Sequence, residues 1–246
     1  FVDQLSERLQ GGGRLIYLGA GTSGRLGVLD ASECPPTFNA APWQIVGIIA
    51  GGDAALRRSS EAKEDDPTGA HDALHELAIA SNDTVLGIAA GATTPWVLGG
   101  VEEAGRLGAM TGLLTCAPLP PSIQIDHHIL LDTGAELLAG STRLKAGTAT
   151  KIALNAITTS LFLRLGKVYE NLMVDLRATN AKLHDRCLRI LCELCPELDR
   201  TSADLVLQEA GGDLKLAIVM MKRGVDLQEG RRMLDEAGGL LQEVLA

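Results

Sequence analysis

Aromatic residues are scarce in this sequence, since Phe, Trp and Tyr make up only 3% of its 246 residues. Basic residues are also few: 22 Lys and Arg stand against 31 Asp and Glu, which gives a formal net charge of -9. The chain therefore lacks the cationic surface that binding to nucleic acid requires, and we predict no nucleic-acid partner. No apolar run reaches the roughly 18 residues of a membrane span, so we expect no membrane partner either.

The cysteines do not form the even set that a disulfide framework requires. There are five of them, and residues 1–7 lack the charged and apolar regions of a signal peptide. We therefore expect reduced thiols and a cytoplasmic location. Cys187, Cys192 and Cys195 have no second pair of ligands, which argues against a zinc site, and we predict no metal.

The sequence does contain 46% hydrophobic residues, enough for one full-sized domain and a small second one. Short apolar runs alternate with segments of helical period, which is typical of βαβ units. We predict an α/β fold with a doubly wound, mostly parallel sheet of five strands, at residues 15–18, 44–50, 84–89, 110–116 and 128–131. The predicted helices cover residues 24–32, 54–64, 70–80, 95–107 and 143–165.

The last part of the chain has a different pattern. Glu-Ala-Gly-Gly occurs at 209–212 and again at 236–239, each time before a Leu-rich segment. We interpret these glycine pairs as helix ends and close turns. The pattern predicts a main domain over residues 1–195 and a small helical C-terminal subdomain over residues 196–246.

A glycine-rich loop follows the first predicted strand. Gly19-Ala20-Gly21-Thr22-Ser23-Gly24 has the G-x-G-x-x-G spacing of a dinucleotide site. Residues 37–43 lack the acidic residue that such a site places about 20 positions later to bind a ribose. Thr22 and Ser23, at the start of a predicted helix, instead favour a phosphate monoester. The alternative is an ordinary turn with Thr or Ser as the helix cap.

Three further segments carry carboxylates. Residues 30–37 place acidic groups between an apolar helix and a Pro-Pro corner, where burial raises the pKa of a carboxyl as a general acid requires. The charge run 61–66 is by itself typical of a solvated helix end. Residues 136–145 join a carboxylate, two hydroxyls and two cations at the entrance of the long helix, where they either receive an anion or cap the helix and face solvent.

Taken together, these motifs resemble the N-acetylmuramic acid 6-phosphate etherases, which carry a sugar isomerase (SIS) domain. The resemblance covers nearly the whole chain, with its specific parts at residues 19–38, 49–52, 140–149, 166–169 and 171–175. It implies an SIS-type sugar-phosphate-binding catalytic domain over residues 1–195 and a homodimer. The implied reaction is a lyase reaction that cleaves the D-lactyl ether of N-acetylmuramic acid 6-phosphate by elimination and hydration. The products are N-acetylglucosamine 6-phosphate and D-lactate, and no cofactor is required.

The resemblance also assigns two catalytic carboxyls. The family's acid, which protonates the departing lactate oxygen, matches Glu33 in Ala31-Ser32-Glu33-Cys34-Pro35-Pro36. The family's base, which removes the C2 proton of the ring-opened sugar, matches Glu64. The remaining implied residues bind the substrate: Gly21, Thr22 and Ser23 at the phosphate, Thr93 in the loop after the third strand, and Ser141, Thr142 and Lys145 at the sugar. Glu136 matches the glutamate that SIS isomerases place five residues before a similar Ser-Thr.

The sequence departs from the family pattern in three places. Gly91-Ala92-Thr93-Thr94-Pro95 stands where the family usually has Ser-Gly-Arg-Thr-Pro, and Ala62-Lys63 replaces Gly-Ala. The family also has a longer N-terminal helical region, so the resemblance implies further residues before Phe1. Two other functions remain: an aldose-ketose isomerase, and a non-catalytic sugar-phosphate sensor similar to the glucokinase regulatory protein. The sensor lacks the Glu-Cys-Pro-Pro motif, so Glu33 favours the etherase.

Overall fold

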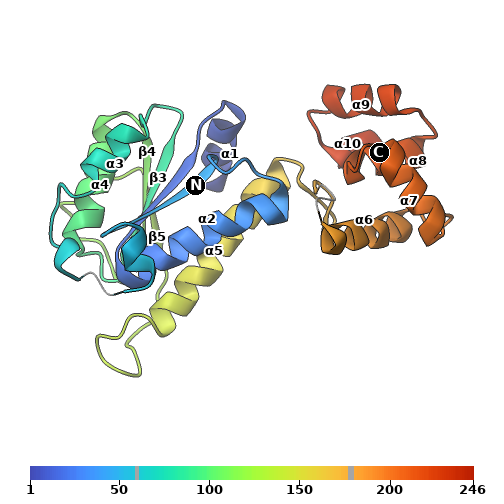
Figure 1. Ribbon diagram of the computed structural model, residues 1–246. Coiled ribbons are helices and arrows are strands. Elements are labelled where there is room, and N and C mark those ends of the chain that lie inside the picture. The colour runs from blue at the N-terminus through green and yellow to red at the C-terminus, as the bar shows by residue number, and fades with distance from the viewer. Residues whose placement is uncertain (59–60, 177–179) are drawn as a thin grey trace. The chain divides into compact units, whose positions relative to one another are not determined.

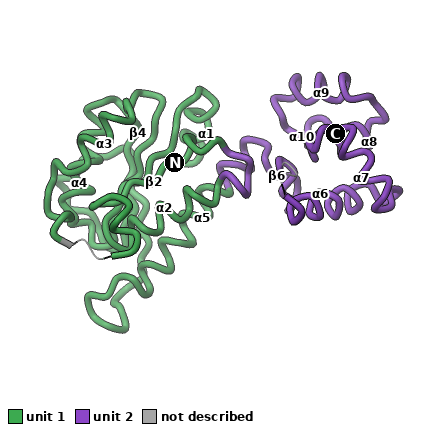
Figure 2. The backbone as a smooth tube through the Cα atoms, in the orientation of Figure 1, with its two compact units in different colours: residues 1–34, 41–159 green, residues 35–40, 160–246 purple. Residues whose placement is uncertain are grey.

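The computed structural model describes residues 1–58, 61–176 and 180–246. The chain divides into two compact units (Figure 2). Unit 1 contains residues 1–34 and 41–159, and unit 2 contains residues 35–40 and 160–246.

Unit 1 is built on a five-stranded sheet in the order β2-β1-β3-β4-β5, in which every neighbouring pair is parallel. The strands are β1 (Leu15–Gly19), β2 (Ile45–Ile49), β3 (Thr84–Ile88), β4 (Met110–Thr115) and β5 (His127–Leu130). All residues of β1, β3 and β4 are buried, as expected of strands covered on both faces. The predicted fold and its five strands are confirmed. The strand order reverses beside β1, so the carboxyl ends of β1 and β3 form the crevice where sheets of this kind bind ligands.

Helices cover both faces of this sheet, as predicted. They are α1 (Val2–Gln10), α2 (Gly21–Phe38), α3 (His71–Glu76), α4 (Pro95–Arg106) and α5 (Lys145–Arg164). Figure 1 shows α3 and α4 on one side of the sheet and α2 and α5 on the other. Their positions follow the alternation along β1, since Ile16 and Leu18 join the core under α3 and α4, whereas Tyr17 bonds to α2.

The predicted helix over 54–64 is wrong. The described residues there form two short 3-10 turns, η1 (Asp53–Leu56) and η2 (Glu61–Lys63), and residues 59–60 lie outside the described part of the chain. The side chain of Arg25 explains part of the difference, because it donates to the carbonyls of Leu56 and Arg58. The segment is thus held to α2 by a long cation and does not form a helix of its own.

The predicted end of α2 near residue 32 is also wrong. The helix continues through Pro35 and Pro36 to Phe38. Proline breaks a helix by removing an N–H and by crowding the preceding turn. In the last turn of α2, the buried Phe38 ring stacks on Phe162 within unit 2, with the ring centroids 4.5 Å apart. This aromatic contact offsets part of the cost of the two prolines.

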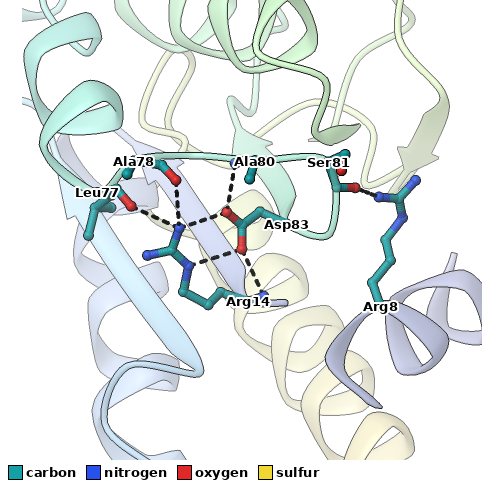
Figure 3. A network of polar contacts seen from close by, with 7 residues as sticks. All are labelled: Arg8, Arg14, Leu77, Ala78, Ala80, Ser81 and Asp83. Carbon is teal, nitrogen blue, oxygen red and sulfur yellow. Dashed lines mark hydrogen bonds and ion pairs between the residues drawn. The ribbon is translucent and has the colours of Figure 1, made fainter. Parts of the chain in front are cut away.

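An ion-pair network ties the amino ends of β1 and β3 together (Figure 3). Arg14 donates from Nε and Nη2 to the two carboxylate oxygens of Asp83, at 2.9 and 2.7 Å, and the backbone N–H of Ala80 donates to the same carboxylate at 3.0 Å. Burial alone would raise the pKa of Asp83, but the bonds from Arg14 hold it below its ordinary value. Because this network lies at the amino ends of the strands, it braces the sheet at the edge away from the ligand crevice.

The helices α2 and α5 lie side by side in matching register. Three pairs of positions are neighbours: 22 with 147, 30 with 155, and 34 with 158. Between the first two pairs, positions 26 and 151 line the same two cavities. Each pair lies about one turn further along both helices. The best-defined contact is a hydrogen bond of 2.8 Å from Asn155 Nδ2 to Asp30 Oδ1. The two helices therefore run in the same direction and bring their first turns together.

Unit 2 contains a short hairpin and a group of helices around its own core. The hairpin pairs β6 (Val168–Tyr169) with β7 (Leu172–Met173), and the helices are α6 (Ala181–Leu194), α7 (Arg200–Glu209), α8 (Leu214–Arg223), α9 (Leu227–Glu236) and α10 (Leu241–Leu245). The predicted domain boundary after residue 195 differs from the boundary of this unit. The difference arises because α6 contributes Cys187, Leu188 and Leu191 to the same core as α7 and α8.

The repeated Glu-Ala-Gly-Gly segments close two helices in the same way, as predicted. Gly211 and Gly212 after α7, and Gly238 and Gly239 after α9, all have positive φ. The N–H of Gly212 donates to Leu207 O at 2.8 Å, and the N–H of Gly239 donates to Leu234 O at 2.8 Å. Both are the six-to-one bonds of a Schellman ending, for which glycine is the preferred residue.

Candidate active site

The glycine-rich loop turns directly from β1 into α2. A Cβ placed on Gly24 would lie 2.5 Å from the carbonyl oxygen of Gly19, so the turn has no room for a side chain there. Gly21 has a φ of 51° and is the first residue of the helix. Thr22 and Ser23 therefore lie within the first turn of α2 and not before it as a helix cap. Both residues are half-buried, and the backbone N–H groups of a first helical turn favour an anion.

Glu64 faces the start of α2. A Cβ placed on Gly21 would lie 3.1 Å from Oε1 of Glu64, and the backbone N–H of Trp96 in α4 donates to Glu64 O at 3.0 Å. Glu64 is half-buried, whereas Lys63 and Asp65 on either side of it are exposed. The interpretation of this segment as a solvated charge run therefore does not hold for Glu64, whose carboxylate is fixed next to the predicted phosphate loop.

Glu136 caps the start of α5. Its two carboxylate oxygens accept from the backbone N–H groups of Lys145 and Ala146, each at 2.9 Å. The bond from Ala146 and then that from Lys145 lower the pKa of Glu136. The helix is thus capped by Glu136, not by the side chains of Ser141 and Thr142 that precede it. The first turns of α5 and α2 adjoin, because a Cβ on Gly147 would lie 3.5 Å from Cγ2 of Thr22.

Thr93 lies in the loop after β3 and is exposed, next to a strained residue. Ala92 is buried and has a φ of 55°, a left-handed conformation that costs roughly 1–2 kcal/mol for a residue with a Cβ. The family pattern has glycine at this position. The loop therefore has the left-handed backbone conformation that suits glycine, although the residue at this position is alanine.

Glu33 is exposed and lies far along α2 from the loop. Twelve residues separate it from Gly21, which places the two positions about 18 Å apart along the helix axis. Glu33 lines a cavity of about 230 Å³ together with Asp30, Lys151 and Asn155. Of the two carboxyls in the segment 30–37, the buried one is Asp30, which is 5% exposed.

Asp30 is the centre of a buried polar cluster that the motifs did not reveal. Its carboxylate accepts from Tyr17 Oη at 2.9 Å, Asn155 Nδ2 at 2.8 Å and Thr158 Oγ1 at 3.3 Å. Burial raises the pKa of Asp30, although these three bonds oppose the rise. The expected rise in pKa from burial in this segment thus occurs at Asp30. The sequence signal that was available is the spacing of Asn155 and Thr158, which lie on one face of the long helix.

The structure therefore assembles some of the predicted residues and leaves others apart. Gly21, Thr22, Glu64 and the start of α5 come together at the carboxyl end of the sheet, while Glu33 of the same chain does not. Within residues 1–58, 61–176 and 180–246, no group of three His, Cys, Asp or Glu side chains is arranged to hold a metal ion. In the same ranges, no helix is both long and apolar enough to cross a membrane.

Several curated proteins similar to this chain carry the same name. The chain is 50% identical over 246 residues to the N-acetylmuramic acid 6-phosphate etherase of Synechococcus sp. (strain CC9605), an alignment that covers 100% of this chain and 78% of the relative. It is 48% identical over 248 residues to the protein of that name from Rhizobium rhizogenes, covering 100% of this chain and 80% of the relative. The chain belongs to the N-acetylmuramic acid 6-phosphate etherase family.

Two other comparisons concern the fold. Residues 1–104 match the family model of the glucokinase regulatory protein N-terminal SIS domain. A presumed phosphosugar isomerase involved in capsule formation from Bacteroides fragilis has a similar fold, with a TM-score of 0.53 and 19% identity over 69% of this chain and 80% of that one. An Escherichia coli protein solved in complex with a small ligand gives a TM-score of 0.50 at 15% identity, over 70% of this chain and 80% of that one. These likenesses support an SIS-type fold for this etherase family member.

Proposed function

We propose that this protein is a lyase that cleaves the D-lactyl ether of N-acetylmuramic acid 6-phosphate. The reaction yields N-acetylglucosamine 6-phosphate and D-lactate. The structural observation that carries the proposal is the position of the Glu64 carboxylate beside Gly21, the first residue of α2. The start of this helix is where the phosphate of a sugar phosphate would bind, so Glu64 lies next to that site. The family name shared by relatives over the full chain supports the substrate.

The mechanism needs two carboxyls in opposite protonation states. Glu64, as the ionised base, removes the C2 proton of the ring-opened sugar, and the electron pair forms the C2–C3 double bond as the C3–O bond breaks. Glu33, as the acid, gives its proton to the departing lactate oxygen. Water then adds to C3 of the unsaturated aldehyde, which restores a hydroxyl there.

The separation of the two carboxyls within one chain has a consequence for assembly. C2 and C3 are adjacent atoms, so the base and the acid must reach the same few ångströms of substrate, whereas positions 21 and 33 of α2 lie about 18 Å apart. We propose that the protein is a homodimer in which one copy supplies Glu64 and the phosphate loop and the other supplies Glu33. A two-fold interface would then complete two equivalent sites.

The remaining predicted residues have supporting roles in this proposal. Thr22 and Ser23 bind the 6-phosphate, and Ser141, Thr142 and Lys145 close the sugar site, with Thr93 near the phosphate. The isomerase alternative would use Glu136 as its base. The bonds from Lys145 and Ala146 to both carboxylate oxygens of Glu136 favour a helix-capping role for it over proton transfer. The five free thiols suit a reducing compartment, and we propose a cytoplasmic location.

The decisive experiment measures release of D-lactate. Purified protein incubated with N-acetylmuramic acid 6-phosphate is expected to release one D-lactate for each N-acetylglucosamine 6-phosphate formed. Glu64→Gln serves as the matched inactive protein. The absence of D-lactate with the wild type, together with tight binding of the sugar phosphate, would favour the sensor alternative, and conversion of an aldose to a ketose would favour the isomerase.

A further inference from the structure

The groove between α2 and α5 contains a cation that the mechanism above does not use. Lys151 of α5 is exposed and lines two cavities, one of about 230 Å³ and one of about 310 Å³, and Leu26 also lines both. Thr22 lines the larger cavity and Glu33 lines the smaller one. Among the ion pairs of the described residues, none includes Lys151.

Asp30 does not form an ion pair with Lys151. The carboxylate of Asp30 already accepts three hydrogen bonds, all from the neutral donors Tyr17, Asn155 and Thr158. Lys151 acts on Asp30 through space only, and its effect on the pKa of Asp30 is the smallest of the contributions. The ammonium group is therefore available to an anion that enters the cavity.

The smaller cavity matches the chemistry of one particular substituent. Its wall carries the cation of Lys151, the carboxyl of Glu33, and an apolar surface from Leu26, Leu29 and Leu154. A lactyl group presents a carboxylate, an ether oxygen that needs a proton when it departs, and a methyl group. Each of these three features has a partner of suitable chemistry on the cavity wall.

We propose that this cavity is the subsite for the lactyl group and that Lys151 binds the lactyl carboxylate. The inference rests on the proposed etherase function and deepens it. Lys151 and Glu33 line the same cavity of one chain, so they reach the substrate together whichever copy supplies them.

The test replaces the cation in two ways. Lys151→Met removes the charge and is expected to raise the KM for D-lactate release by about 10- to 100-fold, the range of one charge-assisted hydrogen bond. Lys151→Arg keeps the charge and is expected to recover most of the loss. Affinity for the product N-acetylglucosamine 6-phosphate, which has no lactyl group, should be unchanged in both variants and also shows that they fold. Lys222→Met, at an exposed lysine in unit 2, is the matched control.

A binding comparison separates this inference from the etherase function itself. Glu33→Gln protein, with and without Lys151→Met, is titrated with the lactyl ether and with the 3-O-ethyl ether of the same sugar phosphate, which lacks the carboxylate. A preference for the lactyl ether that disappears with Lys151→Met supports the subsite even if the wild type releases no D-lactate. If the wild type releases D-lactate and Lys151→Met changes neither KM nor the preference, the subsite is wrong and the etherase stands. An equal loss of affinity for the product would also overturn the subsite, because Lys151 would then act on the sugar phosphate.

Discussion

Asn155 donates a hydrogen bond of 2.8 Å to Asp30, and this bond joins the middle of α5 to the middle of α2. The same carboxylate accepts from Tyr17 in β1, so one buried acid links the central strand to both helices. These bonds fix the relative positions of the two helices that carry the proposed site residues. The first turn of α2 carries Thr22 and Ser23, the proposed phosphate residues. The proposed sugar residues lie at the start of α5 and in the loop before it. Glu33 lies one turn beyond Asp30 on α2.

Removal of the Tyr17 hydroxyl should destabilise the protein in a pH-dependent way. Tyr17→Phe deletes a bond to an ionised group, and we expect the free energy of unfolding at pH 7 to fall by about 1.5 to 3 kcal/mol. Urea denaturation measures the change. Tyr169→Phe, at a half-buried tyrosine of unit 2, is the matched control and should cost less.

The pH dependence follows from the direction of the Asp30 shift. Burial raises the pKa of Asp30 above 3.8 in the folded protein. The folded protein therefore gains stability when Asp30 is protonated. This gain is complete below pH 3.8 and is lost as the pH rises through the raised pKa. The Tyr17 hydroxyl stabilises the ionised form. The cost of Tyr17→Phe should therefore shrink as the pH falls from 7 towards 4, and a cost that grew over that interval would contradict the assignment.

The two proposed catalytic carboxyls should fail at different steps. In Glu33→Gln the base remains, so exchange of the C2 proton with deuterated solvent should continue while D-lactate release falls by about 100-fold or more. In Glu64→Gln both should fall together. NMR of the recovered substrate and a D-lactate assay measure the two quantities. The opposite pattern would exchange the two roles, and an effect of Glu136→Gln alone would make Glu136 the catalytic carboxylate.

The parallel sheet was predictable from sequence because its three central strands, β1, β3 and β4, are fully buried. Leu15–Gly19 and Thr84–Ile88 are continuous apolar runs bounded by turn residues, and that local signal survives into the folded chain. The segment 54–64 has helical spacing too, but its carbonyls at Leu56 and Arg58 bond to Arg25. A competing partner thirty residues away in the sequence is not visible in a local pattern.

In the candidate site too, features that depend on local sequence were predictable and features that depend on contacts with distant residues were not. The spacing of the glycines identified the turn at Gly21, because the requirement is local. The burial of Asp30 in place of Glu33 depends on Tyr17 and Asn155, which come from other elements, so no property of the segment 30–37 could select between the two acids. The position of Glu64 against Gly21 depends on where the loop after β2 returns to α4, which is likewise a property of the tertiary fold.

The phosphate should be the main anchor of the substrate. Thr22 and Ser23 offer two hydroxyls at the start of α2, and each charge-assisted bond contributes about 1.5 to 3 kcal/mol. The double variant Thr22→Ala with Ser23→Ala should therefore weaken binding of N-acetylglucosamine 6-phosphate by about 100-fold or more. Titration calorimetry measures this affinity, and circular dichroism verifies the fold. Equal affinity of the wild type for phosphorylated and unphosphorylated sugar would rule out the anchor.

The last prediction tests whether one site draws its carboxyls from two copies of the chain. Glu33→Gln and Glu64→Gln are each inactive in D-lactate release, but in a mixed dimer one of the two sites would receive an intact Glu33 from one copy and an intact Glu64 from the other. Random mixing makes half of the dimers mixed, and each of these has one complete site, so about a quarter of wild-type activity should return. The variants are mixed in equal amounts under conditions that exchange subunits, with each variant alone as the control. If both carboxyls acted within one chain, no mixed dimer would contain a complete site, and activity would stay at the level of the separate variants.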